Sequence, residues 1–160
     1  MAEIWYAILA LMLTAFVVLA GWDFGAGAIL HVVGRTPHER RIVIGAIGPL
    51  WTWNEVWIVA SGGVFVMAFP KLMGTAFSGF YLALMLVVWC LLLRGISLEL
   101  GGHVNDPMWR GLWDFVFAAS NILLAILFGA AAGNVLRGVP IGLDGRFSLE
   151  LFTDFRATGH

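Results

Sequence analysis

The sequence predicts an all-α membrane protein with four transmembrane helices, and two observations carry this prediction. The 160 residues are 61% hydrophobic and only 12% charged, whereas a soluble domain usually holds about 25% charged residues. The charge-free tracts are also long: 22 uncharged residues separate Lys71 from Arg94, and about 20 helical residues cross a bilayer. We therefore expect a four-helix transmembrane unit over residues 1–140, followed by a polar C-terminal tail over residues 141–160.

The first predicted span covers residues 4–33. It begins after Glu3 and stays uncharged up to Asp23, beyond which the chain is apolar again as far as Val33. A single helix of this length would hold Asp23 inside the membrane, where a carboxylate costs at least about 2.5 to 3.5 kcal/mol. Such a group is normally paired, protonated or hydrated, so Asp23 is a candidate for chemistry.

The second predicted span covers residues 42–69 and follows a polar loop over residues 34–41. Thr36 and Glu39, with a proline between them, form the pattern of a capping box that starts a helix in this loop. Pro49 lies inside the span, and we expect it to kink the helix or to end a short interfacial helix.

The third and fourth predicted spans cover residues 73–96 and 113–136. Arg94 stands near the end of the third span and Glu99 follows five residues later, so we expect a structural ion pair between them. Asp114 stands at the start of the fourth span, where a negative charge interacts favourably with the helix dipole.

Small residues mark the positions at which the helices are expected to pack closely. Glycines spaced four residues apart allow transmembrane helices to approach each other, and this spacing occurs on the first and fourth spans. The residues that we assign to helix packing are Gly21, Gly25, Gly129, Gly133 and Asn134.

Four spans would place the loops 34–41 and 99–110 on the same side of the membrane. These loops and the span ends next to them carry five arginines, against four basic residues on the other side. Because cytoplasmic loops are enriched in Lys and Arg, we expect this side to be cytoplasmic.

The candidate site consists of Asp23, Asn54, Glu55 and Trp57. Glu55 lies 13 uncharged residues beyond Arg41, well inside the second span. A carboxyl group in apolar surroundings suits proton relay, so we interpret the site as part of a proton path or as an electrostatic counterpart to a cofactor. An alternative is a small ion-coupled transporter or channel that acts as a dimer, with the two acids binding the coupling ion.

Other classes of function are not indicated. Cys90 is the single cysteine, and the four histidines show no metal-ligand spacing, so no metal site is predicted. The net charge of −1 gives no reason to expect nucleic-acid binding.

Six motifs follow one another along the chain. They are GWDFGAG (21–27), IGPLWTWNEVW (47–57), AFSGFYLAL (76–84), the Arg94–Glu99 ending, MWRGLWD (108–114) and GNVLRGVP (133–140). Together they resemble subunit II of the cytochrome bd quinol oxidases, including the cyanide-insensitive branch, and the match covers nearly the whole chain.

The resemblance implies a subunit of a bacterial inner-membrane enzyme that oxidises quinol and reduces oxygen to water. In that family haem b and haem d belong to the larger subunit I. Subunit II is haem-free and not catalytic alone; it supports subunit I and contributes to a proton path. The implied partners are subunit I, membrane lipid and quinol, and a bound quinone is compatible with the resemblance, which leaves ubiquinol and menaquinol both open.

The resemblance also implies residue roles. Asp23 matches the acid of the first family motif, Glu55 lies within the NEVW block, and Arg94 and Glu99 match the basic and acidic residues that close the third span. Thr52 departs from the pattern, because family members often carry at this position an acid implicated in the proton path.

Members of the family have eight spans arranged as two four-span repeats, and this chain resembles the first repeat. Because four is an even number, a second four-span unit would insert beside the first with the same orientation. We therefore expect a second half-subunit, or a second copy of this chain, to complete the eight-span architecture. A purely structural role in assembly is a third interpretation.

Overall fold

The computed structural model describes residues 2–104 and 106–137. Within these residues the chain is helical and forms no strand: α1 (Ala2–Ala28), α2 (Leu30–Val33), α3 (Pro37–Ala68), α4 (Pro70–Gly79), α5 (Tyr81–Leu100) and α6 (Pro107–Arg137). Four of these helices, α1, α3, α5 and α6, are long and apolar enough to cross a membrane. The predicted all-α architecture with four spans is confirmed, and the predicted tail over residues 141–160 lies outside the described residues.

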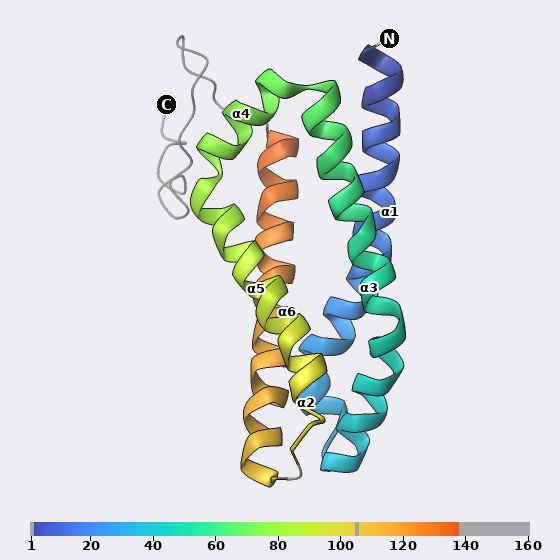
Figure 1. Ribbon diagram of the computed structural model, residues 1–160, viewed down its shortest axis with the longest axis vertical. Coiled ribbons are helices and arrows are strands. Elements are labelled where there is room, and N and C mark those ends of the chain that lie inside the picture. Colours follow the sequence, from blue (N-terminus) through green and yellow to red (C-terminus); the bar gives the residue numbers. More distant parts are fainter. Residues whose placement is uncertain (1, 105, 138–160) are drawn as a thin grey trace.

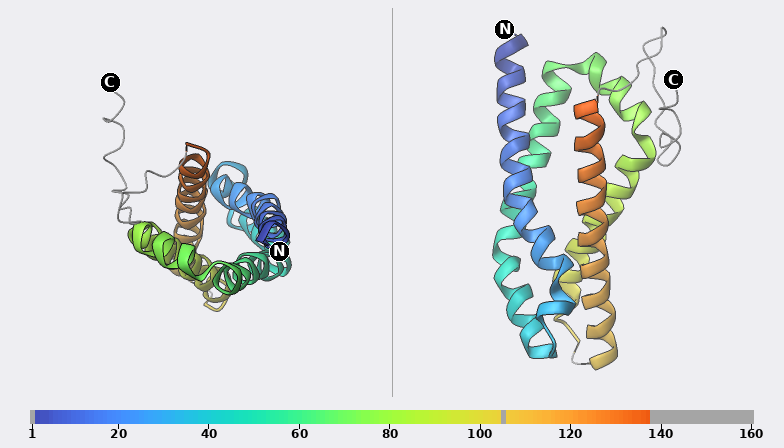
Figure 2. Two further views of the ribbon diagram at one scale, coloured as in Figure 1. Left: turned by 90° about the horizontal axis from the view of Figure 1, so that it is seen from above. Right: turned by 180° about the vertical axis from the view of Figure 1, so that it is seen from behind.

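The four long helices form an elongated bundle (Figure 1). Helix α1 packs between α3 and α6, and α6 also packs along α5, whereas α3 and α5 approach each other less closely. Figure 2 shows the bundle from above and from behind. The N-terminus, α4 and the last turns of α6 lie at one end, and the α2–α3 and α5–α6 turns lie at the other, which we call the loop end. The expectation that loops 34–41 and 99–110 share one side agrees with this arrangement.

The first predicted span is interrupted. The predicted single helix over residues 4–33 is divided at Ile29, a turn residue between α1 and α2. Gly25 and Gly27 lower the helix propensity just before this turn. Leu30, directly after it, is fully buried and packs in a cluster with residues of α3 and α6. The turn therefore directs α2 into the bundle.

Helix α3 starts in the loop, as the capping-box pattern predicts. The Glu39 backbone N–H donates to Thr36 Oγ1 at 3.3 Å, and the Thr36 N–H donates to Glu39 Oε2 at 3.1 Å. The helix then continues through Pro49 to Ala68, so Pro49 does not end a separate interfacial helix. The observed helix begins five residues before the predicted span.

The third predicted span, residues 73–96, consists of parts of two helices. Phe80, with φ −97° and ψ 18°, separates α4 from α5. Helix α4 runs over the end of the bundle, and α5 descends from it (Figure 1). The break follows Gly79, a residue with low helix propensity, and the continuous helix expected here is wrong.

Helix α6 begins at Pro107, about two turns before the predicted start. Asp106 caps it, since the Met108 N–H donates to Asp106 Oδ1 at 3.1 Å. Asp114 is therefore not a helix-start acid. It lies 3.6 Å from Arg40 Nη1 and forms an ion pair that joins α6 to the first turn of α3.

Two apolar clusters form the core of the bundle. One contains Phe16, Ala20, Phe24, Cys90 and Leu124. The other contains Leu30, Ile47, Phe117 and Ala118. On α6 a buried polar residue, Asn121, lies between Phe117 of one cluster and Leu124 of the other. On α5, Arg94 likewise lies between Cys90, which belongs to the first cluster, and Leu98, which packs against the second. A polar layer therefore separates the two clusters.

Candidate functional site

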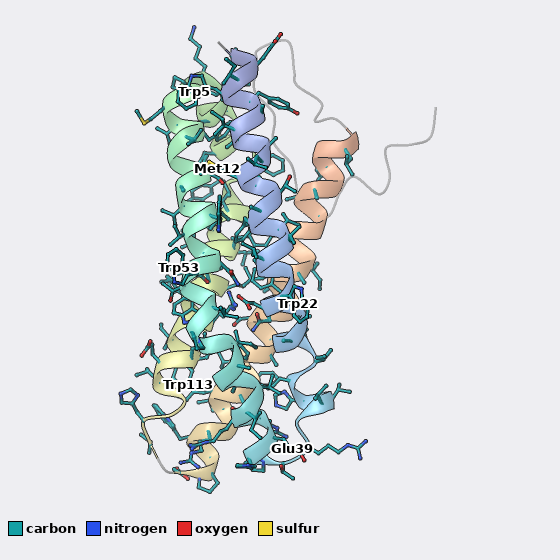
Figure 3. The ribbon with its side chains drawn as sticks, turned by 90° about the vertical axis from the view of Figure 1, so that its right-hand side faces the viewer. Trp5, Met12, Trp22, Glu39, Trp53 and Trp113 are labelled. Atoms are coloured by element: carbon teal, nitrogen blue, oxygen red, sulfur yellow. The ribbon has the colours of Figure 1, made fainter. Side chains whose placement is uncertain are left out.

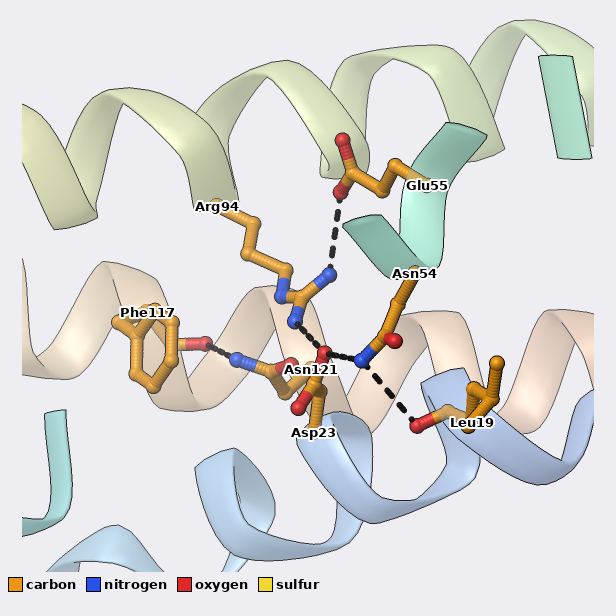
Figure 4. A network of polar contacts seen from close by, with 7 residues as sticks. All are labelled: Leu19, Asp23, Asn54, Glu55, Arg94, Phe117 and Asn121. Atoms are coloured by element: carbon orange, nitrogen blue, oxygen red, sulfur yellow. Dashed lines mark hydrogen bonds and ion pairs between the residues drawn. The ribbon is translucent and has the colours of Figure 1, made fainter. Parts of the chain in front are cut away.

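Arg94 is the centre of the polar layer (Figure 4). Its side chain is fully buried, with 0% of its surface exposed. Nη1 donates a hydrogen bond to Glu55 Oε1 at 3.1 Å, and Nη2 lies 3.3 Å from Asp23 Oδ2. The guanidinium also lies 5.0 Å from the centre of the Phe24 ring, a cation–π contact. Three helices, α1, α3 and α5, thus meet at one charged group.

The predicted ion pair between Arg94 and Glu99 is wrong. Residues five apart on a helix lie about 140° apart around its axis, because each residue turns the helix by about 100°. Arg94 shares the buried face of α5 with Cys90 and Ser97, whereas Glu99 is exposed. The buried arginine therefore pairs with acids of two other helices, which are distant in sequence.

Asp23 is held by two different partners. Its Oδ2 atom accepts a hydrogen bond from Asn54 Nδ2 at 2.6 Å and lies beside Arg94. Asn54 Nδ2 lies also 3.4 Å from the carbonyl oxygen of Leu19, one turn earlier on α1. Asp23 and Asn54 are both buried. Three of the four predicted site residues, Asp23, Asn54 and Glu55, are therefore brought together.

Trp57, the fourth predicted site residue, is not brought into this network. Its side chain is exposed, and the contact it makes through its carbonyl oxygen is with Ser61 Oγ. Trp22 and Trp53, each next in sequence to a buried polar residue, also lie on the outer surface of the bundle (Figure 3), 81% and 73% exposed. The rings of Trp22 and Trp53 therefore face outward, whereas the neighbouring Asp23 and Asn54 face inward.

Asn121 was not predicted as a site residue. It is fully buried in α6, where its Nδ2 donates to the Phe117 carbonyl oxygen at 2.7 Å. Its Oδ1 atom and Arg94 Nε have no hydrogen-bond partner among the described residues. The signal in the sequence was an amide deep within a charge-free tract, similar to the signal that identified the buried acids.

The packing glycines are not the predicted ones. A side chain added at Gly21, Gly25, Gly129 or Gly133 would meet nothing within 4 Å, so these residues make no close helix contact within the described chain. Gly27 does, because a methyl group there would overlap the side chain of Asn121. The close approach of α1 and α6 therefore occurs at the level of the polar layer. Asn134 is half-buried near the end of α6.

The network reaches the surface on both sides of α3. A groove of about 680 Å³ between α3 and α5 is lined by Trp51, Glu55, Gly95 and Glu99, and the Glu55 side chain is 22% exposed. A second groove of about 550 Å³, between α1 and α3, has Asp23 and Asn54 in its lining. A small molecule or proton donor in either groove would therefore contact one acid of the network.

Among the described residues, the polar layer contains no histidine. His31, His38 and His103 are all exposed and belong to the loop end. Among the described residues no group of three His, Cys, Asp or Glu side chains could hold a metal ion. The histidines of the described residues therefore lie away from the polar layer.

The sequence was also compared with known proteins. Residues 1–159 match the family described as cytochrome bd terminal oxidase subunit II. A probable cytochrome oxidase subunit 2 from Haemophilus influenzae is 41% identical over 137 residues, which is 86% of this chain and 36% of that protein.

Two further relatives give the same result. The cytochrome bd-I ubiquinol oxidase subunit 2 of Escherichia coli is 36% identical over 88% of this chain and 37% of its own length. The cytochrome bd ubiquinol oxidase subunit 2 of Bacillus subtilis is 33% identical over 89% of this chain and 42% of its own length. The chain therefore spans roughly two fifths of the length of the relatives it matches.

Proposed function

The chain belongs to the cytochrome bd terminal oxidase subunit II family, and on this premise we propose that it is a haem-free membrane subunit of a bd-type quinol:oxygen oxidoreductase. In this role it supports a haem-bearing subunit I and contributes to a proton path. The observation that carries the proposal is the trio of Arg94 and Asp23, which are both buried, and Glu55, which is 22% exposed. The family membership favours this role over that of an ion-coupled transporter.

The trio suits proton handling because its charges do not balance. Two carboxylates share one guanidinium in the middle of the bundle, so full ionisation leaves one negative charge in apolar surroundings. Such an uncompensated charge is costly. The network is neutral when one of the two carboxyl groups holds a proton, and it can release that proton only when another positive charge arrives.

The two grooves supply entry and exit for that proton. Glu55 faces the groove between α3 and α5, and Asp23 lines the groove between α1 and α3. Water or partner side chains in the grooves would continue the path, and Asn54 orients Asp23 through its hydrogen bond. The geometry favours proton transfer along the inner side of α3, from the groove between α3 and α5 to the groove between α1 and α3.

The haem groups are assigned to a partner. The exposed histidines at the loop end and the polar layer without histidine support this assignment. In the complex, haem b and haem d of subunit I would supply electron transfer from quinol to oxygen, which is reduced to water. The residues of this chain would hold and move protons beside them.

A second four-span unit is part of the proposal. Such a unit, a half-subunit or a second copy of this chain, would correspond to the part of the relatives that this chain does not match. A side chain added at Gly21, Gly25, Gly129 or Gly133 would meet nothing within 4 Å, and this open space supports a close approach by such a partner. The complex would reside in a bacterial inner membrane, with loops 34–41 and 99–110 facing the cytoplasm.

An apolar cavity supports the proposal that quinone binds to the complex. About 330 Å³ of space lies where α1, α3, α4, α5 and α6 meet, and Leu13, Phe65, Phe80, Val87 and Phe128 are among its lining residues. This lining suits the isoprenoid tail of a quinone.

The proposed function is tested by purifying, through a tag on this chain, the complex that contains it. We expect haem absorption, with the red band of haem d, to co-purify, and quinol oxidase turnover to be present. Glu55→Gln and Asp23→Asn should each lower turnover about tenfold or more with haem content unchanged, since loss of a positioned proton carrier has large kinetic effects.

The matched control is Glu3→Gln, which neutralises an exposed acid in the first turn of α1. Its turnover should equal that of the unmodified complex. An intact preparation without haem would reject the oxidase and favour ion transport. Unchanged turnover in both network variants would instead indicate a purely structural role in assembly.

A further inference from the structure

The polar layer contains two buried atoms that the ion pairs do not use, Arg94 Nε and Asn121 Oδ1. Both side chains are fully buried, with 0% of their surface exposed, and neither atom has a hydrogen-bond partner among the described residues. We propose that the two atoms bind one water molecule between them and that Asn121 thereby positions the guanidinium of Arg94. The proposal rests on the geometry of the polar layer and not on the oxidase function.

Arg94 and Asn121 lie at the same level of two neighbouring helices. Helix α6 packs along α5, and each of the two residues lies between the two apolar clusters of the core. Figure 4 shows the Asn121 amide extending from the Phe117 carbonyl oxygen toward the Arg94 guanidinium. The two unpartnered atoms therefore belong to the same part of the bundle interior.

The orientation of the Asn121 amide follows from its hydrogen bond. Its Nδ2 donates to the Phe117 carbonyl oxygen at 2.7 Å, and a carbonyl oxygen can only accept. The amide must therefore turn its nitrogen toward this carbonyl and its oxygen away from it. Gly27 of α1 closes against the same side chain, with no room for a methyl group between them. Oδ1 is thus held in place and needs a donor that comes to it.

The guanidinium of Arg94 has a donor that the acids do not use. A guanidinium carries five N–H donors in one plane. Nη1 donates to Glu55 Oε1 at 3.1 Å, and Nη2 lies 3.3 Å from Asp23 Oδ2. Because the planar group is held at this end, the Nε–H cannot turn to a new acceptor without losing contact with an acid.

Water is the ligand that matches the two atoms. The bridging group has to accept a hydrogen bond from Nε and donate one to Oδ1, and a buried water molecule does both at once. The nearest hydroxyl groups along the two helices are engaged: Ser97 Oγ donates to the Leu93 carbonyl oxygen at 2.6 Å, and Ser120 Oγ bonds in the same way within α6. Leaving a buried donor and a buried acceptor unpaired is costly, and internal water commonly satisfies such groups.

The bridge has a consequence for the network of Asp23, Arg94 and Glu55. It joins α6 to the three helices that already meet at the guanidinium. With Nε held on one side and the acids on the other, the plane of the guanidinium has a fixed direction. Asn121 then acts on the two acids through Arg94, without touching either of them itself.

The proposal is tested by cryo-electron microscopy of the complex purified through this chain, at a resolution that shows ordered water. We expect a density peak within about 2.5 to 3.2 Å of both Arg94 Nε and Asn121 Oδ1, the range of a hydrogen bond. The map requires neither haem nor turnover, so its outcome is independent of the proposed function. A map of the unmodified complex without this peak, or with Nε bonded directly to Oδ1, overturns the proposal and needs no variant.

Three variants test the positioning role of Asn121. Asn121→Leu keeps the shape of the side chain but removes its oxygen. The peak should disappear, and at least one contact of Arg94 with its acids should lengthen beyond about 3.5 Å. Asn121→Asp keeps an oxygen at the Oδ1 position and should retain the peak and both contacts. Ser120→Ala is the matched control, since it removes a neighbouring buried polar group that bonds within α6, and it should also retain them.

The variants can contradict the proposal in three ways. A peak that persists in Asn121→Leu would show that Asn121 does not hold the water. Loss of the peak in Asn121→Asp would assign the effect to the lost bond with Phe117. Contacts of Arg94 that lengthen equally in Asn121→Leu and Ser120→Ala would indicate a general loosening of the bundle and not a positioning role.

Discussion

Gly27 on α1 lies directly against Asn121 on α6, with no room for a methyl group between them. The contact brings the two helices together at the level of the trio, because Asp23 lies one turn before Gly27 on the same helix. Asn121 cannot give way easily, since it is fully buried and its Nδ2 is bonded to the Phe117 carbonyl oxygen.

We expect Gly27→Ala to destabilise the protein by about 1 to 3 kcal/mol, the usual cost of overpacking a core. Unfolding of the purified protein in mixed micelles, followed by circular dichroism, measures this change. Gly21→Ala is the matched control, because a methyl group at that position meets nothing within 4 Å. Equal effects of the two substitutions would show that the contact with Asn121 is not decisive.

Arg94→Met should be among the most damaging substitutions in the chain. It leaves the carboxyl groups of Asp23 and Glu55 facing each other without their shared cation, and breaking a buried ion pair from one side costs about 3 to 5 kcal/mol. The measurement is again unfolding in micelles, or the folded yield if the variant is too unstable.

Neutralising the acids should restore part of that loss. The triple variant Arg94→Met/Asp23→Asn/Glu55→Gln is expected to be more stable than Arg94→Met alone, since coupled residues do not contribute additively. Glu99→Gln is the control, because Glu99 is exposed and not paired with Arg94. A strong effect of Glu99→Gln on stability would contradict the observed pairing.

The start of α6 gives a contrast between two acids. Asp106→Ala removes the side chain that accepts the Met108 N–H, and loss of an N-cap costs about 0.5 to 2 kcal/mol. Asp114→Asn breaks a partly exposed ion pair with Arg40, and such pairs are worth about 0 to 1 kcal/mol. Unfolding measurements should therefore rank the Asp106 variant as the less stable one. The reverse order would support the original assignment of Asp114 as the helix-start acid.

The architecture and most of the site could be predicted because both depend on local chemistry. Charge-free tracts are sufficient to identify spans, and a lone acid such as Asp23 within one of them is conspicuous. The capping box at Thr36 was equally visible, since its residues lie within one turn.

The pairing of Arg94 could not be predicted, because it depends on how α1, α3 and α5 rotate about their axes. Glu55 lies 39 residues from Arg94 in sequence. Glu99 is much nearer in sequence, but it lies on the exposed face of α5 and Arg94 on the buried face. The breaks at Ile29 and Phe80 were also missed. Glycines before each break lower the helix propensity, but the position of the first break depends on tertiary packing as well, since Leu30 is buried against α3 and α6.

The last prediction concerns the number of protons in the trio. If neutrality governs the network, the resting protein holds one proton on Asp23 or Glu55, because one guanidinium compensates one carboxylate. Infrared spectroscopy in H2O and D2O detects a protonated carboxyl group through its C=O stretch, and we expect one such band that is sensitive to Asp23→Asn or Glu55→Gln. Glu3→Gln, which changes an exposed acid, should leave the band unaltered. Two ionised carboxylates and no protonated band would mean that a further cation from a partner compensates the trio, and the proton path proposed through these residues would have to be abandoned.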